Sequence, residues 1–264
     1  MWNEFSDIFV FNNVEFSIYE NPCQSIKQLN KYYYLEHKYK NFLINNNGTI
    51  PKIIHQIAPS DKSKWHPLWF ECQKTWLINY PDSEYEYKLW NDEDDLENLI
   101  KNNFPFFFKD FKSYPFKIQR IDIARYFILL KYGGIYADMD FYCYNNFYEF
   151  LDKQRSNIAL SPWTNVEILQ NSLMASNLNN NYIFVNIIDE AVRRKKYNLS
   201  HDHMSFISQT TGPKLVSDVY DILKSFLNPL EMKLYNPIGC KSQDDENLYN
   251  KNTCYCKHFG TGKW

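Results

Sequence analysis

Two aspartates, Asp138 and Asp140, stand two residues apart at the end of a run, KYGGIYADMDFY, that otherwise predicts a buried strand. If the strand continues, residues two apart point to the same face. We expect instead that the strand ends here and leaves both carboxylates at its carboxyl edge. Two carboxylates this close repel each other. A divalent cation resolves the conflict, and oxygen ligands suit Mg²⁺ or Mn²⁺ together with substrate phosphates.

A second pair of charges, Asp122 and Arg125, lies about one helix length earlier in an apolar run. Residues three apart share a helical face, so we expect both to be half-buried near the sheet. One interpretation is an internal salt bridge that only holds the helix in place. The other is that Asp122 accepts sugar hydroxyls while Arg125 contacts phosphate or sugar. Gly133 and Gly134 form the following turn and would also let backbone approach a ligand.

The elements that must position these residues alternate between strands and helices. TIPKIIHQIA predicts a first buried strand with His55 and Gln56 at its carboxyl end, where ligands bind in open α/β sheets. A histidine that only satisfies the core is the alternative for His55. Further strands are predicted near residues 85–91, 135–144, 157–163 and 169–175, and helices over 66–81, 91–103, 115–134, 181–198 and 210–226. This order predicts an α/β fold with a mainly parallel sheet.

Length and composition limit the remaining possibilities. The 264 residues suit one α/β domain at 48–264 and an N-terminal helical appendage at 1–47, separated by the punctuating NNNG. A net charge of −2 argues against a nucleic-acid partner. The first residues lack a basic signal region, and no run approaches the ~20 apolar residues of a membrane span, so we expect a cytoplasmic protein without a transmembrane segment. The six scattered cysteines are expected to be reduced thiols.

The string RIDIARYFILLKYGGIYADMD is far more specific than an isolated Asp-x-Asp. It resembles the glycosyltransferases whose sugar-binding region contains the DXD motif. These include the yeast-type initiating α-mannosyltransferases and, more distantly, the catalytic domains of clostridial glucosylating toxins. IPKIIHQI, NSLMAS, TGP and HFGTGKW extend the resemblance over residues 50–264.

The resemblance implies a GT-A fold, a Rossmann-like α/β sheet, and a metal-dependent hexosyltransferase that retains anomeric configuration. The donor would be a nucleotide sugar, with UDP-sugars favoured and GDP-mannose possible, and the acceptor a glycan or protein. By carry-over, Asp140 would bind Mn²⁺ or Mg²⁺ and Asp138 would contact ribose or sugar hydroxyls beside the ion. Asp122 and Arg125 would hold the transferred sugar and the phosphate.

Other residues receive roles only through the resemblance. His258 would be a third metal ligand, and Lys263 or Trp264 would contact the diphosphate, although some related patterns have serine where Lys263 stands. A frayed terminus with an incidental histidine is the alternative. The remaining predicted donor contacts are His55, Gln56, Gly134, Met139 and Asn171.

Two other classes of function compete with a transferase. A metal-dependent phosphohydrolase would carry its Asp-x-Asp near the first strand with a small hydroxyl residue after it, whereas Phe141 and Tyr142 follow here. The other class is a catalytically inactive nucleotide-sugar-binding module. Measured turnover of a donor would separate it from an enzyme. The joint presence of five candidate site residues argues against it: Asp122, Arg125, Asp138, Asp140 and His258.

Overall fold

The structure is a computed structural model that divides into two compact units, Met1–Ile44 and Asn45–Trp264. It describes residues 8–11, 14–17, 34–35, 37–38, 48–161, 168–178, 182–196, 202–236 and 252–262. In the first unit, β1 (Ile8–Phe11) and β2 (Val14–Ser17) form an antiparallel pair that the sequence pattern did not predict. Most of the helix predicted before Ile44 lies outside the described residues.

The second unit is built on a six-stranded sheet in the order β4-β3-β5-β8-β7-β9. Its strands are β3 (Ile53–Ala58), β4 (Glu86–Asn91), β5 (Gly134–Ala137), β7 (Ser156–Ser161), β8 (Ile168–Ser176) and β9 (Leu227–Leu230). β3 pairs in parallel with β4 and β5, and β7 with β9, whereas β8 is antiparallel to both of its neighbours. Every strand of the sheet except β8 therefore runs in one direction, and the predicted mainly parallel α/β class is confirmed.

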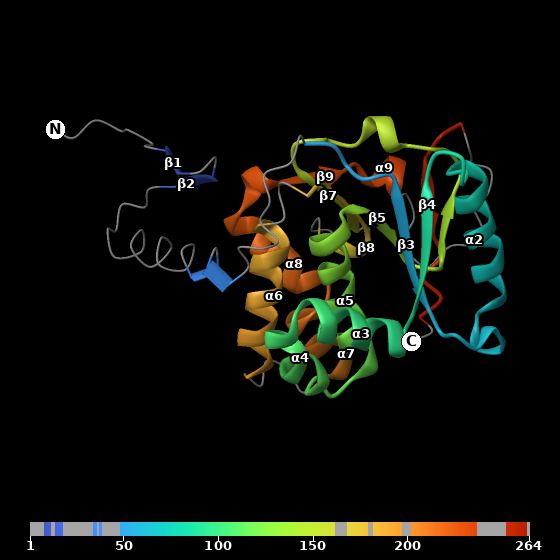
Figure 1. Ribbon diagram of the computed structural model, residues 1–264. Helices are drawn as coiled ribbons and strands as arrows, with labels where there is room; N and C mark the ends of the chain where they lie inside the picture. The colour runs from blue at the N-terminus through green and yellow to red at the C-terminus, as the bar shows by residue number, and fades with distance from the viewer. Residues whose placement is uncertain are drawn as a thin grey trace. The chain divides into compact units, whose positions relative to one another are not determined.

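Helices flank this sheet on both sides, with α2 on one side and the group around α5 on the other (Figure 1). The helices are α2 (Pro67–Asn79), α3 (Asp94–Asn103), α4 (Pro105–Lys112), α5 (Lys117–Tyr132), α6 (Tyr182–Lys195), α7 (His203–Thr210), α8 (Pro213–Ile222) and α9 (Met232–Tyr235). A small antiparallel sheet of β6 (Phe141–Cys143) and β10 (Cys256–His258) packs on the α2 side. In the part of the chain that is described, no helix is both long and apolar enough to cross a membrane.

The run from Lys117 to Cys143 forms the centre of the unit. Helix α5 is buried along almost its whole length, because it lies between the sheet and the other helices. It ends at Gly133, whose φ of 61° is a left-handed conformation that glycine adopts without strain. The strand predicted at 135–144 is in fact two strands, since the chain turns at residues 138–140. This turn brings both aspartates to the carboxyl end of β5.

One face of the sheet buries an apolar cluster under α2. Ile54, Ile135 and Leu173 from three neighbouring strands lie in the same cluster as Trp76 and Tyr80. The Trp76 Nε1–H donates to the Phe141 carbonyl oxygen at 2.8 Å, which ties α2 to the segment directly after Asp140. Burial of these apolar side chains therefore packs α2 against the sheet next to the segment that follows Asp140.

Candidate active site

The turn that carries Asp138 and Asp140 is fixed by hydrogen bonds to both neighbouring strands. The Asp138 N–H donates to the Ser172 carbonyl of β8 at 2.8 Å, and the Gln56 amide donates to the Asp138 carbonyl from β3 at 3.2 Å. The Phe141 N–H closes the turn on the Asp138 carbonyl at 3.1 Å. The two carboxylates are therefore held at the end of β5 by the sheet itself.

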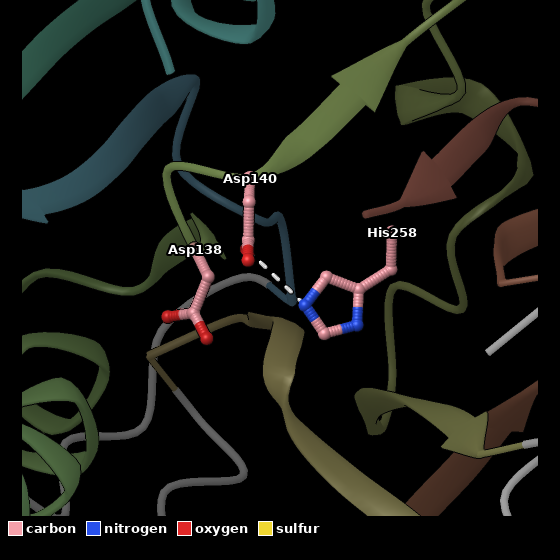
Figure 2. Close-up of side chains that lie close together, drawn as sticks. All are labelled: Asp138, Asp140 and His258. Atoms are coloured by element: carbon pink, nitrogen blue, oxygen red, sulfur yellow. Dashed lines mark hydrogen bonds and ion pairs between the residues drawn. The ribbon is translucent and has the colours of Figure 1, made fainter. Parts of the chain in front are cut away.

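Asp140 is paired with groups from the C-terminal segment. Figure 2 shows His258 pointing from β10 toward Asp140, and its Nε2 lies 3.1 Å from Oδ1. The other carboxylate oxygen accepts from the backbone N–H and the hydroxyl of Thr261 at 2.8 and 3.1 Å. Burial alone would raise the pKa of Asp140, but His258 and Thr261 outweigh it and lower this pKa to about 2. Asp140 is therefore a carboxylate at neutral pH.

Asp138, Asp140 and His258 together form a possible metal site. One ligand atom from each lies within 4.8 Å of the other two. At bonds of about 2.1 Å, neighbouring ligands of a small divalent ion are about 3.0 Å apart and opposite ligands about 4.2 Å apart, so the side chains would draw together by up to about 1–2 Å on binding an ion. Two carboxylates and an imidazole are a donor set that Mn²⁺ accepts. The residues present therefore fit a divalent cation.

Arg125 neutralises the other aspartate from the α5 side. Its Nη1 lies 3.1 Å from Asp138 Oδ1 and donates to the Asn171 carbonyl at 2.8 Å. Tyr136 lies on β5 two residues before Asp138, and its hydroxyl donates to the Asp138 carboxylate at 2.6 Å. Burial raises the pKa of Asp138 although Arg125 opposes the rise. The buried Arg125 Nε has no hydrogen-bond partner among the described residues, so one donor remains available.

Asp122 is enclosed by donors from three elements. Asn171 of β8 and Thr211, between α7 and α8, each donate to one of its oxygens at 2.9 Å. Arg125 Nη2 lies 3.3 Å from the carboxylate. Burial nevertheless raises the pKa of Asp122 to about 6 because it outweighs all three partners. The predicted internal salt bridge is therefore present, and it joins the same network as Asp138.

His55 was predicted at the carboxyl end of its strand, but it lies in the first half of β3, beside Gly133 at the start of β5, and is fully buried. Its Nδ1 accepts from the Trp90 indole N–H at 3.2 Å, so its Nε2 carries the proton and donates to the Gly133 carbonyl at 3.0 Å. Burial lowers the pKa of His55 to about 3, and the ring is neutral. Both ring nitrogens are occupied by the protein, so the geometry favours the core histidine over a donor contact.

Three further predicted donor contacts have structural tasks in this fold. Gln56 is fully buried, donates to the Asp138 carbonyl and accepts from the Tyr87 hydroxyl at 2.6 Å. Gly134 starts β5, at the opposite end from the aspartates, and a Cβ there would lie 2.5 Å from the Ile53 carbonyl oxygen. Met139 is buried in a cluster with Ala58 and two tryptophans, Trp65 and Trp69. All three are buried and position the turn and the sheet, and their predicted donor contacts stay predictions.

Three predicted donor contacts remain: Asn171 lies in the hydrogen-bond network around Asp122, and the other two lie beyond the described part of the chain. Asn171 is buried, and its amide donates to Asp122 and to the Tyr126 hydroxyl, each at 2.9 Å. Lys263 and Trp264 lie outside the described residues, so their predicted diphosphate contacts stay predictions.

Several residues that complete the site had no role predicted from the sequence. Tyr136 was detectable from its strand spacing to Asp138, and Thr211 and Thr261 lie within the quoted TGP and HFGTGKW segments. Thr261 also accepts from the Trp69 indole at 3.0 Å, which joins α2 to the C-terminal segment. Nothing in the local pattern indicated that Thr211 would reach Asp122.

Comparison with known proteins identifies the family. Residues 67–158 match the family described as "Glycosyltransferase sugar-binding region containing DXD motif". The uncharacterized glycosyltransferase L373 of Acanthamoeba polyphaga mimivirus is 31% identical over 234 residues, which cover 81% of this chain and 84% of that protein. The chain therefore belongs to the DXD-containing glycosyltransferases, and the predicted transferase class and GT-A type of α/β fold are confirmed. Family membership does not favour a phosphohydrolase.

Other similarities cover less of the protein compared or are more distant. Inositol phosphoceramide mannosyltransferase 3 of Schizosaccharomyces pombe is 43% identical over 99 residues, covering 38% of this chain and 26% of that protein. The chain thus matches about a quarter of that relative's length. The solved structure titled "PaToxG Glycosyltransferase" has a TM-score of 0.47 and 17% identity, covering 75% of this chain and 76% of that one.

Proposed function

We propose that the chain transfers a hexose from a nucleotide sugar to an acceptor, with a divalent cation held by Asp138, Asp140 and His258. The observation that carries the proposal is this cluster, whose ligand atoms lie within 4.8 Å, in a chain of the DXD glycosyltransferase family. Mn²⁺ is the cation we propose first, because the imidazole adds a nitrogen ligand that suits it better than Mg²⁺.

The residues around the cluster support departure of a diphosphate. When bound, the cation would neutralise charge that develops on the leaving phosphate oxygens. Arg125 is a permanent cation held rigidly by Asp122 and Asp138, so its charge does not have to reorganise during the reaction. Its buried Nε has no hydrogen-bond partner among the described residues, and we propose that it donates to the sugar or phosphate when the donor binds. Asp138 would accept hydroxyls of the ribose or the sugar.

We also propose retention through same-face attack of the acceptor. A covalent route needs a carboxylate nucleophile at the sugar. The three buried acids of the site are already paired: Asp122 with Thr211, Asp138 with Arg125, and Asp140 with His258. This pairing supports same-face attack over a covalent intermediate.

Mannose is the first hexose to test, because the fungal relatives are named mannosyltransferases. This makes GDP-mannose as strong a candidate as the UDP-sugars that the sequence resemblance favoured. The acceptor remains a glycan or protein, and the same relatives' names add inositol phosphoceramide to the panel.

The test combines donor binding with turnover. Thermal melts with GDP-mannose or UDP-sugars are measured with Mn²⁺ and with EDTA, and release of nucleoside diphosphate is followed in parallel. A donor at 100 times its Kd stabilises the fold by about 2.7 kcal/mol, or roughly 5–10 °C for a chain of this size. Asp140→Asn should lose both signals, whereas Asp110→Asn, whose carboxylate pairs with Lys195, should keep them.

Two results would contradict the proposal in different ways. If EDTA and Asp140→Asn leave both donor binding and turnover intact, the metal role is wrong. A metal-dependent shift without release of nucleoside diphosphate, with or without acceptor, would instead favour the inactive binding module.

A further inference from the structure

Cys143 and Cys256 face each other across the small sheet that carries His258. They are register partners in the antiparallel pair of β6 and β10. Both side chains are buried, at 1% and 0% exposure, and belong to the core cluster under α2. The Cys143 thiol donates to the Asn145 carbonyl at 3.3 Å, and both cysteines are free thiols. The fold therefore brings together two sulfurs from positions 113 residues apart in the sequence.

The hydrogen-bond pattern of the ladder makes this pair suitable for a disulfide. The Tyr144 N–H donates to the Tyr255 carbonyl at 2.7 Å, and the Phe259 N–H donates to the Asp140 carbonyl at 3.0 Å. Because these bonds alternate along an antiparallel ladder, the Cys143 position is a non-hydrogen-bonded one. In such pairs the Cα atoms are about 4.5 Å apart and the side chains approach closely, which lies within the range of about 4.4–6.8 Å that disulfides require.

A separate contact agrees that Cys143 is at a non-hydrogen-bonded position of the ladder. The Cys143 N–H donates to the Thr75 hydroxyl of α2 at 2.9 Å and not to β10. The next position on the same face of the ladder is Phe141 opposite His258, whose rings stack at 4.4 Å with an interplanar angle of 10°. The thiol pair and the stacked pair are thus adjacent cross-strand pairs on one face.

We propose that Cys143 and Cys256 are an oxidation site, and that their disulfide fastens the His258 strand to the segment that follows Asp140. The oxidant class is a small-molecule disulfide such as glutathione disulfide. Each protein thiol loses its hydrogen, one S–S bond forms in the protein, and the small disulfide accepts two electrons and two protons to become two thiols. Because both thiols are buried, the exchange requires transient opening of the three-residue strand β10 and is slow.

The disulfide would act on the metal site through its position. Cys256 and His258 are two residues apart on one face of β10, so the covalent link restricts the distance from the imidazole to Asp140. A group of ligands held in place before binding loses less conformational freedom on taking up an ion. This consequence rests on the proposed function, whereas formation of the disulfide does not.

Oxidation of the whole chain followed by peptide mapping tests the pairing. The protein is incubated with glutathione disulfide, alkylated, digested and mapped by mass spectrometry. We expect a Cys143–Cys256 linked peptide and a melting temperature higher by roughly 5–10 °C, because the link closes a long loop, with reversal by dithiothreitol. Cys254→Ser should keep the link, and Cys143→Ser should abolish both link and stabilisation. A reduced pair after prolonged oxidation, or predominant pairing with another cysteine, would overturn the proposal.

Calorimetric titration with Mn²⁺ alone separates this inference from the proposed function. The oxidised chain should bind Mn²⁺ at least threefold more tightly than the reduced chain, and His258→Ala should remove the difference. Equal affinity in both forms would overturn the coupling to the metal site. If the link forms and stabilises the fold but neither form binds Mn²⁺, the proposed metal role fails while the oxidation site stands.

Discussion

Replacing Thr211 with valine removes one hydroxyl from the buried network while keeping the shape of the side chain. The Thr211 hydroxyl donates to Asp122 at 2.9 Å. The carboxylate would keep Asn171 and Arg125 as partners. A hydrogen bond to a charged group contributes about 1.5–3 kcal/mol, and one between neutral groups about 1 kcal/mol. The loss therefore depends on whether Asp122 is ionised.

The dependence on pH follows from the raised pKa of Asp122. Its folded value of about 6 lies above its ordinary value, so the folded state favours the protonated acid and this contribution to stability declines as pH rises from about 4 toward 6. Removing a donor raises the folded pKa further and extends the decline to higher pH. Thr211→Val should thus lower the free energy of unfolding by about 2–3 kcal/mol at pH 7.5 but only about 1 kcal/mol at pH 5.

Urea unfolding at the two pH values measures this difference. The matched control is Thr210→Val, because Thr210 accepts from Gln119 and donates to the Phe206 carbonyl, each at 2.7 Å, and neither partner is charged. Its loss should be the same at both pH values, and Thr211→Ser should behave nearly as wild type. An equal loss for Thr211→Val at pH 5 and 7.5 would refute the reasoning that this hydroxyl stabilises an ionised Asp122.

Three shorter predictions concern other parts of the site. Gly134→Ala should lower the melting temperature by more than 5 °C, because at a φ of 86° the new Cβ would lie 2.5 Å from a backbone oxygen. Gly262→Ala is the control: its φ is 61°, but the space around its Cβ is open, so it should lower the free energy of unfolding by only about 1 kcal/mol. The pKa of His55 is lowered to about 3 in the folded chain, so protonation of this histidine favours the unfolded chain. Between pH 7 and 4.5 the free energy of unfolding of the wild type should therefore fall by about 2–3 kcal/mol because of this group. His55→Gln takes up no proton and should show a smaller fall in the same urea titrations. Arg125→Lys keeps a charge but cannot form the same planar fork to Asp122 and Asp138, so donor-dependent thermal shifts should disappear while Lys131→Arg leaves them unchanged.

The features of this fold that depend only on residues close together in the sequence could be predicted from it. The Asp122 to Arg125 spacing predicts one helical face, and Gly133 predicts the end of that helix. The two aspartates were expected at the carboxyl end of a strand, and β5 does end at Ala137. These features follow from local backbone geometry, which a single sequence contains. Helix α4 was missed because its eight residues run directly on from α3 with only Phe104 between them.

Contacts between distant segments required the structure. Thr211 reaches Asp122 only because the connection between α7 and α8 packs against α5, and no local spacing encodes that packing. His258 is a similar case, since it lies 118 residues after Asp140 and only the resemblance to a family indicated it. Periodicity indicates which face of an element is buried, but it does not specify the partner on the other side of that face.

At Asn171, a register shift in β8 changes the face that the alternation of side chains along a strand would predict. Leu173 lies in the cluster under α2, and strict alternation along β8 would place Asn171 on that same face. The pairing of β7 with β8 shifts register, because β7 advances from Ile158 to Leu160 while β8 runs from Met174 back to Leu169. The extra residues in β8 let the Asn171 amide turn to Asp122 on α5. The irregularity therefore converts a position expected in the apolar core into a donor for the buried acid, at the carboxyl end of β5 where the sugar is proposed to bind.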